Sequence, residues 1–90
     1  MTKMSLRCFV SGRVQGVFYR RETMNRAVAL GVGGFARNLS DGRVEVVLCG
    51  EKDTVESLRD WLWEGPAAAN VTAVEVEEMP YQEMTNFETR

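Results

Sequence analysis

One segment restricts the possible folds of this chain more than any other: residues 10–20, Val-Ser-Gly-Arg-Val-Gln-Gly-Val-Phe-Tyr-Arg. An apolar alternation ends at Val10, and Gly12 and Gly16 then interrupt the chain before a helical pattern begins. Glycine has no Cβ, so the backbone can turn sharply there and approach a bound group closely. The unpaired N–H groups and the macrodipole at a helix start favour a phosphate-sized anion, and Arg20 adds a planar fork of donors. The segment therefore predicts a strand–loop–helix unit that binds an anion.

The apolar periodicity around this loop predicts a strand before it and a helix after it. Leu6, Cys8 and Val10 alternate with other residues, which indicates a strand that is buried on at least one face. The helix is expected over residues 22–30 and should end at Gly31, because glycine readily adopts the left-handed conformation that closes helices. Its inward positions are expected to be Met24, Ala27 and Val28.

A hairpin is expected next. Residues 34–39 and 43–49 have the composition of strands, and Asp41-Gly42 between them is a strong signal for a tight turn. The positions expected to line one side of the second strand are Val44, Val46 and Leu48.

The second half of the chain predicts one more helix and two more strands. The helix should begin near Asp53, which has capping-box spacing to Glu56, and Gly65-Pro66 should end it. Strands are expected over residues 71–78 and, more briefly, 86–89. The core-facing positions of the helix are expected to be Val55, Leu58 and Leu62.

The resulting order is β-α-β-β-α-β with a short terminal strand. This order predicts an α+β, ferredoxin-like sandwich, because two right-handed crossovers place both helices on one face of an antiparallel sheet. Ninety residues suffice for one core, so residues 1–90 are expected to form a single domain. The fold serves many functions and does not select one by itself.

Charge is divided unevenly along the chain. Residues 1–43 carry eight basic and two acidic side chains, a net charge of +6, whereas residues 44–90 carry three basic and eleven acidic ones, a net charge of −8. A positive half on an acidic protein fits attraction of a small anion and argues against nucleic-acid binding. No stretch approaches the roughly 20 apolar residues of a membrane span, and the first residues lack a signal-peptide core. We therefore expect a cytoplasmic protein with no membrane partner.

The residue inventory excludes several kinds of catalysis. The chain has no histidine, which excludes Ser-His-Asp and Cys-His hydrolases, histidine phosphoryl carriers and histidine-ligated metal sites. Cys8 and Cys49 fall on different expected strands, and buried free thiols are favoured over a disulfide in the cytoplasm. A cysteine-dependent phosphatase needs an arginine at a fixed spacing after its nucleophile, and Val14 stands at that position relative to Cys8.

Residues 10–20 resemble the signature loop of the acylphosphatases. A second stretch is similar to that family's other signature: Gly34-Phe-Ala-Arg-Asn38, three residues, Gly42-Arg-Val44, five residues, Gly50. The similarity extends over essentially the whole chain. Two positions depart from the family pattern, since Tyr19 stands where phenylalanine is usual and Thr89 where a branched aliphatic residue is typical.

The resemblance implies hydrolysis of an acyl phosphate to a carboxylate and inorganic phosphate, with no metal and no cofactor. Carried over by position, it implies that Arg20 binds the phosphoryl group and that Asn38 holds the attacking water. The loop amides that it implies for the rest of the phosphate cradle belong to Gln15, Gly16, Val17, Phe18, Tyr19 and Arg20.

Two other interpretations stay open. A non-catalytic module could use the same loop to bind an anion or a metabolite resembling carbamoyl phosphate, although such a module has no use for Asn38 beside the phosphate. The domain could also act only as part of a larger maturation enzyme, which the length of 90 residues disfavours. The acyl group is not identified by any cluster of residues, and we expect a monomer.

Overall fold

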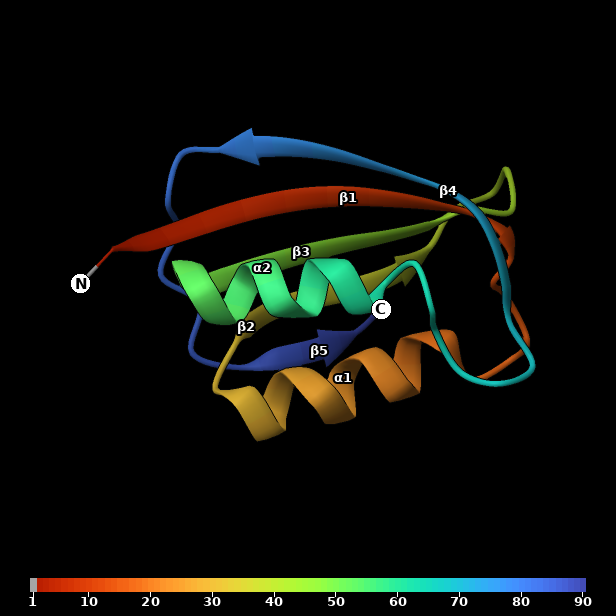
Figure 1. The fold of residues 1–90 in the computed structure, drawn as a ribbon, viewed down its shortest axis with the longest axis horizontal. Helices are drawn as coiled ribbons and strands as arrows, with labels where there is room; N and C mark the ends of the chain where they lie inside the picture. The colour runs from red at the N-terminus through yellow and green to blue at the C-terminus, as the bar shows by residue number, and fades with distance from the viewer. Residues whose placement is uncertain (1) are drawn as a thin grey trace.

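The computed structural model of the protein describes residues 2–90. In chain order it contains β1 (Lys3–Arg13), α1 (Tyr19–Leu30), β2 (Gly33–Asn38), β3 (Val44–Glu51), α2 (Lys52–Trp61), β4 (Asn70–Met79) and β5 (Phe87–Thr89). The strands form one sheet in the order β4-β1-β3-β2-β5, and both helices lie on the same face of it (Figure 1). This is the predicted ferredoxin-like α+β architecture.

The sheet is mixed, which corrects one part of the prediction. β1 pairs antiparallel with β3 and with β4, and β2 pairs antiparallel with β3, but β5 runs parallel to β2. The reason is geometric, because β4 ends at the end of the sheet where β2 begins. The chain crosses the sheet there and enters the opposite edge beside β2, running in the same direction (Figure 1).

The main core lies between the sheet and the two helices. The predicted inward residues of β1, β3 and α2 are all buried in it: Leu6, Cys8, Val10, Val44, Val46, Leu48, Val55, Leu58 and Leu62. In α1 the prediction was wrong for Val28, which is 66% exposed, whereas Ala27 is fully buried. The helix begins at Tyr19 and not at residue 22, and its buried line runs through Tyr19, Thr23 and Ala27, which share one face because they are four residues apart.

The ends of the elements are determined partly by local signals and partly by distant ones. Gly31 closes α1 in the left-handed conformation, at φ 73°, as predicted. The predicted capping box at Asp53 was wrong, because α2 begins at Lys52 directly after β3 and has no side-chain cap. The N–H of Lys52 instead donates to the main-chain oxygen of Thr2 at 2.9 Å, so the residue that precedes β1 caps α2.

The opposite face of the sheet carries a smaller apolar cluster and no helix. Phe35, Val47 and Cys49 are buried there, with Met79 and Met84 packed against them. Cys8 and Cys49 lie on opposite faces of the sheet, and both are buried free thiols, as predicted. Within residues 2–90, no helix has the length and apolarity needed to cross a membrane.

Candidate active site

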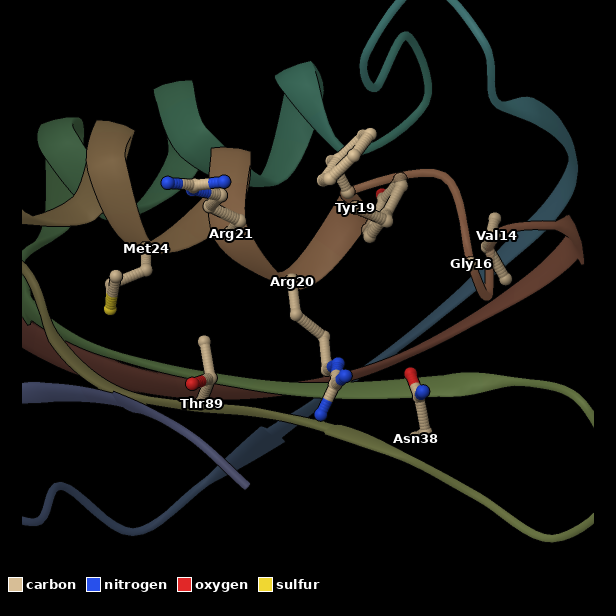
Figure 2. Close-up of a pocket in the computed structure, with 9 residues that line it drawn as sticks. Val14, Gly16, Tyr19, Arg20, Arg21, Met24, Asn38 and Thr89 are labelled. Atoms are coloured by element: carbon tan, nitrogen blue, oxygen red, sulfur yellow. The ribbon is translucent and has the colours of Figure 1, made fainter.

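A pocket of 490 Å³ opens where the loop after β1 meets the ends of β2 and β5. Arg20 reaches into it from the first turn of α1, Asn38 from the last residue of β2, and Thr89 from the last residue of β5 (Figure 2). The complete lining consists of Val14, Gly16, Phe18, Tyr19, Arg20, Arg21, Met24, Asn38 and Thr89. The fold thus gathers at one point side chains that are far apart in the sequence.

The loop from β1 to α1 turns through two left-handed residues. Gly16 has φ 73° and Phe18 has φ 64°, and Phe18 is the residue immediately before α1. Alternation of this kind points successive N–H groups inward and makes an anion-binding concavity. The N–H groups of residues 16–20 have no acceptor among the turn, loop and cap hydrogen bonds of residues 2–90. These donors are therefore available to an anion in the pocket.

A β-bulge lies in β1 just before this loop. The register between β1 and β4 shifts between Ser11 and Gly12, and Gly12 has φ 120°. A Cβ at Gly12 would lie 2.1 Å from the main-chain oxygen of Asn70, so no other residue fits without moving β4. Gly12 thus allows β1 to bend toward the pocket while it stays paired.

Among residues 2–90, no Asp or Glu side chain lies within ion-pair distance of the Arg20 guanidinium. Its Nη1 donates a hydrogen bond of 2.8 Å to the main-chain oxygen of Arg90. That bond holds the side chain across the pocket, and the other guanidinium donors have no protein acceptor within the described residues. Arg20 is positioned to bind an anion.

Asn38 lies on the floor of the pocket with an unsatisfied acceptor. Its Oδ1 is buried and receives no hydrogen bond from any of residues 2–90. Figure 2 shows the amide pointing up from β2 into the space that the guanidinium of Arg20 enters from α1. A buried acceptor without a donor costs about 1–3 kcal/mol, which a bound water molecule can recover.

Gln15 ties the loop to the hairpin that carries Asn38. Its Nε2 donates to the main-chain oxygens of Leu39 at 2.8 Å and Arg43 at 3.0 Å. Both amide protons are used, so the Gln15 side chain holds the protein and leaves the anion to other groups. Since Leu39 follows Asn38, this contact sets the distance between the loop and the asparagine.

Tyr19 anchors the first turn of α1 to the end of α2. Its hydroxyl donates to the main-chain oxygen of Leu62 at 2.5 Å, and its ring stacks on Trp61 with the ring centres 6.0 Å apart. Burial raises the pKa of Tyr19 well above its usual value, so the phenol stays protonated. Tyr19 stands where phenylalanine is usual in the family pattern, and its additional hydroxyl therefore acts as a structural donor.

The two cysteines and the acidic residues offer neither a nucleophile nor a metal site here. Burial raises the pKa of Cys8 to about 12, so this thiol stays protonated at neutral pH. Across residues 2–90, no three His, Cys, Asp or Glu side chains are grouped closely enough to hold a metal ion. The chemistry that the pocket offers is binding of an anion by N–H groups and a guanidinium, beside an amide that can hold water.

The comparisons with known proteins agree with this geometry. Residues 6–89 match the family model described as Acylphosphatase, which spans nearly the whole chain. The chain belongs to the acylphosphatase family.

Close relatives support the assignment at nearly full length. The chain is 49% identical to an acylphosphatase of Nitrosococcus oceani over 94% of this chain and 96% of the relative. It is also 49% identical to one of Pseudomonas aeruginosa, over 100% of this chain and 99% of the relative. A solved acylphosphatase from Coxiella burnetii superposes with a TM-score of 0.93 at 42% identity, over 98% of this chain and 93% of that one.

The structure brings most of the predicted acylphosphatase site residues together. Of these, Gly16, Phe18, Tyr19, Arg20 and Asn38 all line the pocket. The other two do not line it, because the Gln15 side chain is bonded to the hairpin and Val17 is packed in the core. Only the backbone N–H groups of those two residues are left for a phosphate.

Four pocket residues were missed by the sequence analysis: Val14, Arg21, Met24 and Thr89. Met24 was expected only as an inward position of the first helix. No sequence signal could have found Thr89, because its place depends on β5 pairing with β2. The same pairing brings the main-chain oxygen of Arg90 to Arg20.

Proposed function

We propose that this member of the acylphosphatase family hydrolyses the carboxyl–phosphate bond of acyl phosphates, with Arg20 binding the phosphoryl group and Asn38 holding the attacking water. The amides of residues 15–20 complete the phosphate cradle. The observation that carries the proposal is the pairing, in one pocket, of a guanidinium without an Asp or Glu partner and a buried amide oxygen without a donor among residues 2–90.

The chemistry of the substrate explains why so few groups suffice. An acyl phosphate expels a carboxylate, which is a weak base, so no general acid is needed at the leaving oxygen. In a loose transition state the attacking water loses its proton late, and a phosphate oxygen can accept it. The protein then contributes position and stabilisation of the charge on the equatorial oxygens. Arg20 and the loop N–H groups stabilise the charge on the equatorial oxygens, and Asn38 positions the attacking water.

Asn38 favours hydrolysis over the alternative of a pure anion-binding module. An amide oxygen beside a bound phosphate repels the oxygens of the anion and is useless for binding alone. It becomes useful when a water molecule lies between it and the phosphorus and donates a hydrogen bond to Oδ1. That water also fills the acceptor that the protein leaves unsatisfied.

We further propose that residues 1–90 act as a single domain and as a monomer. The loop N–H groups, Arg20 and Asn38 supply the groups that the proposed chemistry needs, and all of them belong to this domain. The small pocket suits a small-molecule substrate and inorganic phosphate as its product.

Hydrolysis of benzoyl phosphate by the purified protein, with a chelator present, tests the proposal. Arg20→Gln should lower kcat/KM by about 10³-fold, because it removes the charged donor on the transferring group. Asn38→Ala should lower kcat by about 10²-fold, the scale of a misplaced nucleophile, and leave competitive inhibition by phosphate in place. Loss of phosphate inhibition is expected only for Arg20→Gln.

Matched controls come from the same chain. Arg13→Gln removes an exposed arginine, and Asn25→Ala an exposed asparagine of α1, neither of which lines the pocket. Full activity of Arg20→Gln or Asn38→Ala would remove that residue from the mechanism. A wild type that binds a non-hydrolysable acyl phosphonate but releases no phosphate from benzoyl phosphate would favour the binding module.

A further inference from the structure

Phe18 occupies a position where a residue with a side chain strains the backbone. Among residues 2–90 it is the only non-glycine residue with positive φ, at 64°. Its ring is 67% exposed and lies outside the buried core cluster. The backbone of Phe18 does a local task, since its oxygen accepts the N–H of Glu22 at 3.0 Å, but any residue could supply that oxygen. Glycine would adopt the conformation without strain, so the fold does not explain the choice of phenylalanine.

Phe18 lines two hollows. One is the pocket that holds Arg20 and Asn38. The other is a groove of 550 Å³ between the loop before α1 and the loop that leads from α2 to β4. These two loops lie side by side at the same end of the molecule (Figure 1). Phe18 and Arg21 line both hollows, so the groove adjoins the phosphate pocket.

The groove has an apolar wall. Besides Arg21 and Glu22, which belong to α1, its lining is Val17, Phe18, Pro66, Ala67 and Ala68. The two alanines contribute small side chains to this wall, and Phe18 contributes a large one. A flat or branched apolar group fits such a surface better than a charged one.

We propose that this groove binds the acyl group of the substrate, with Phe18 as the residue that determines specificity for aromatic and bulky aliphatic acyl phosphates. This inference rests on the proposed function. Once the phosphoryl group lies against the loop amides and Arg20, the acyl group has to leave the pocket past its lining. Phe18 is the lining residue that also belongs to the groove and carries an apolar surface, so the acyl group meets it first. Contact with the acyl group buries the ring that the protein alone leaves exposed.

The test compares benzoyl phosphate with acetyl phosphate, which carry the same charge and differ in the acyl group. The measured quantity is the ratio of kcat/KM for benzoyl phosphate to that for acetyl phosphate. Phe18→Gly should lower this ratio about tenfold, the scale of one lost aromatic contact. A shift of the loop amides changes both substrates alike and cancels in the ratio. Phe18→Leu should recover most of the ratio, because it restores an apolar side chain.

A second variant tests the groove without touching the loop. Ala67→Glu places a charge on the exposed far wall, and it should also lower the ratio while the inhibition constant for phosphate stays near the wild-type value. Val28→Ala is the control, since Val28 is exposed on α1 and lines neither hollow.

The outcomes separate this inference from the proposed function. A wild type that hydrolyses neither substrate overturns the proposed function and this inference with it. Hydrolysis of both substrates with an unchanged ratio in Phe18→Gly and Ala67→Glu overturns the acyl groove alone. A lowered ratio in both variants, with Val28→Ala at the wild-type ratio, supports it.

Discussion

Replacing Tyr19 by phenylalanine tests how the first turn of α1 is held beside the phosphate loop. The hydroxyl of Tyr19 donates to the main-chain oxygen of Leu62 at 2.5 Å. Both residues are buried, with exposed fractions of 1% and 0%. Leu62 lies just after α2, and its oxygen receives no N–H among the turn, loop and cap hydrogen bonds of residues 2–90. The tyrosine is therefore the donor that satisfies it.

The expected loss of stability follows from the loss of this hydrogen bond. Tyr19→Phe keeps the ring and its stacking on Trp61, so it leaves no large cavity. It does leave a buried carbonyl without a donor, which costs about 1–3 kcal/mol. For a domain of this size, each kcal/mol lowers Tm by about 4–8 °C, so a decrease of about 4–24 °C is expected.

Urea unfolding followed by tryptophan fluorescence measures the free energy of unfolding directly. Tyr81→Phe is the matched control, because Tyr81 is 41% exposed and its hydroxyl makes no hydrogen bond within the described chain. We expect the control to stay within about 0.5 kcal/mol of the wild type. Equal unfolding midpoints for the two variants would refute the reasoning, since they would show that the oxygen of Leu62 does not depend on Tyr19.

Two further predictions concern pH and the loop tie. Burial raises the pKa of Cys8 from 9.0 to about 12, so the folded protein retains a proton that the unfolded chain releases. Stability should be complete below pH 9 and fall as the pH rises from about 9 to about 12; a urea midpoint that stays constant over that interval contradicts this. Gln15→Met, which keeps length but removes both amide donors, should cost about 1–2 kcal/mol and lower kcat more than it changes KM. Wild-type stability and kcat in Gln15→Met would show that the tie between loop and hairpin is dispensable.

Much of the fold is predictable from short stretches of sequence. The alternation of Leu6, Cys8 and Val10 predicted the buried face of β1, and those residues are buried. Gly31 and the Asp41-Gly42 pair predicted where α1 and the hairpin turn, because few residues tolerate a positive φ. These signals are reliable because each depends on neighbours a few residues away.

Predictions failed where a contact with a distant segment competes with the local signal. Asp53 has good capping spacing, yet α2 starts earlier because the oxygen of Thr2 accepts the N–H of Lys52. Val28 has the right helical spacing, yet it is exposed, because the buried line of α1 passes through Thr23. A polar residue can occupy that line since its hydroxyl donates to the main-chain oxygen of Tyr19 at 2.7 Å.

The candidate site likewise combines features that depend on local sequence with features that depend on distant contacts. The amino-acid sequence alone determined the two-glycine loop, the helix that follows it and the residues that are able to bind an anion. The reason is that backbone freedom depends on the residue type and donor geometry on the individual side chain. The tertiary structure alone decided that Arg20 and Asn38 share a pocket, that Thr89 joins them and that Phe18 borders a second hollow. Those relations depend on strand register and on helix packing against the sheet, which result from contacts summed over the whole chain.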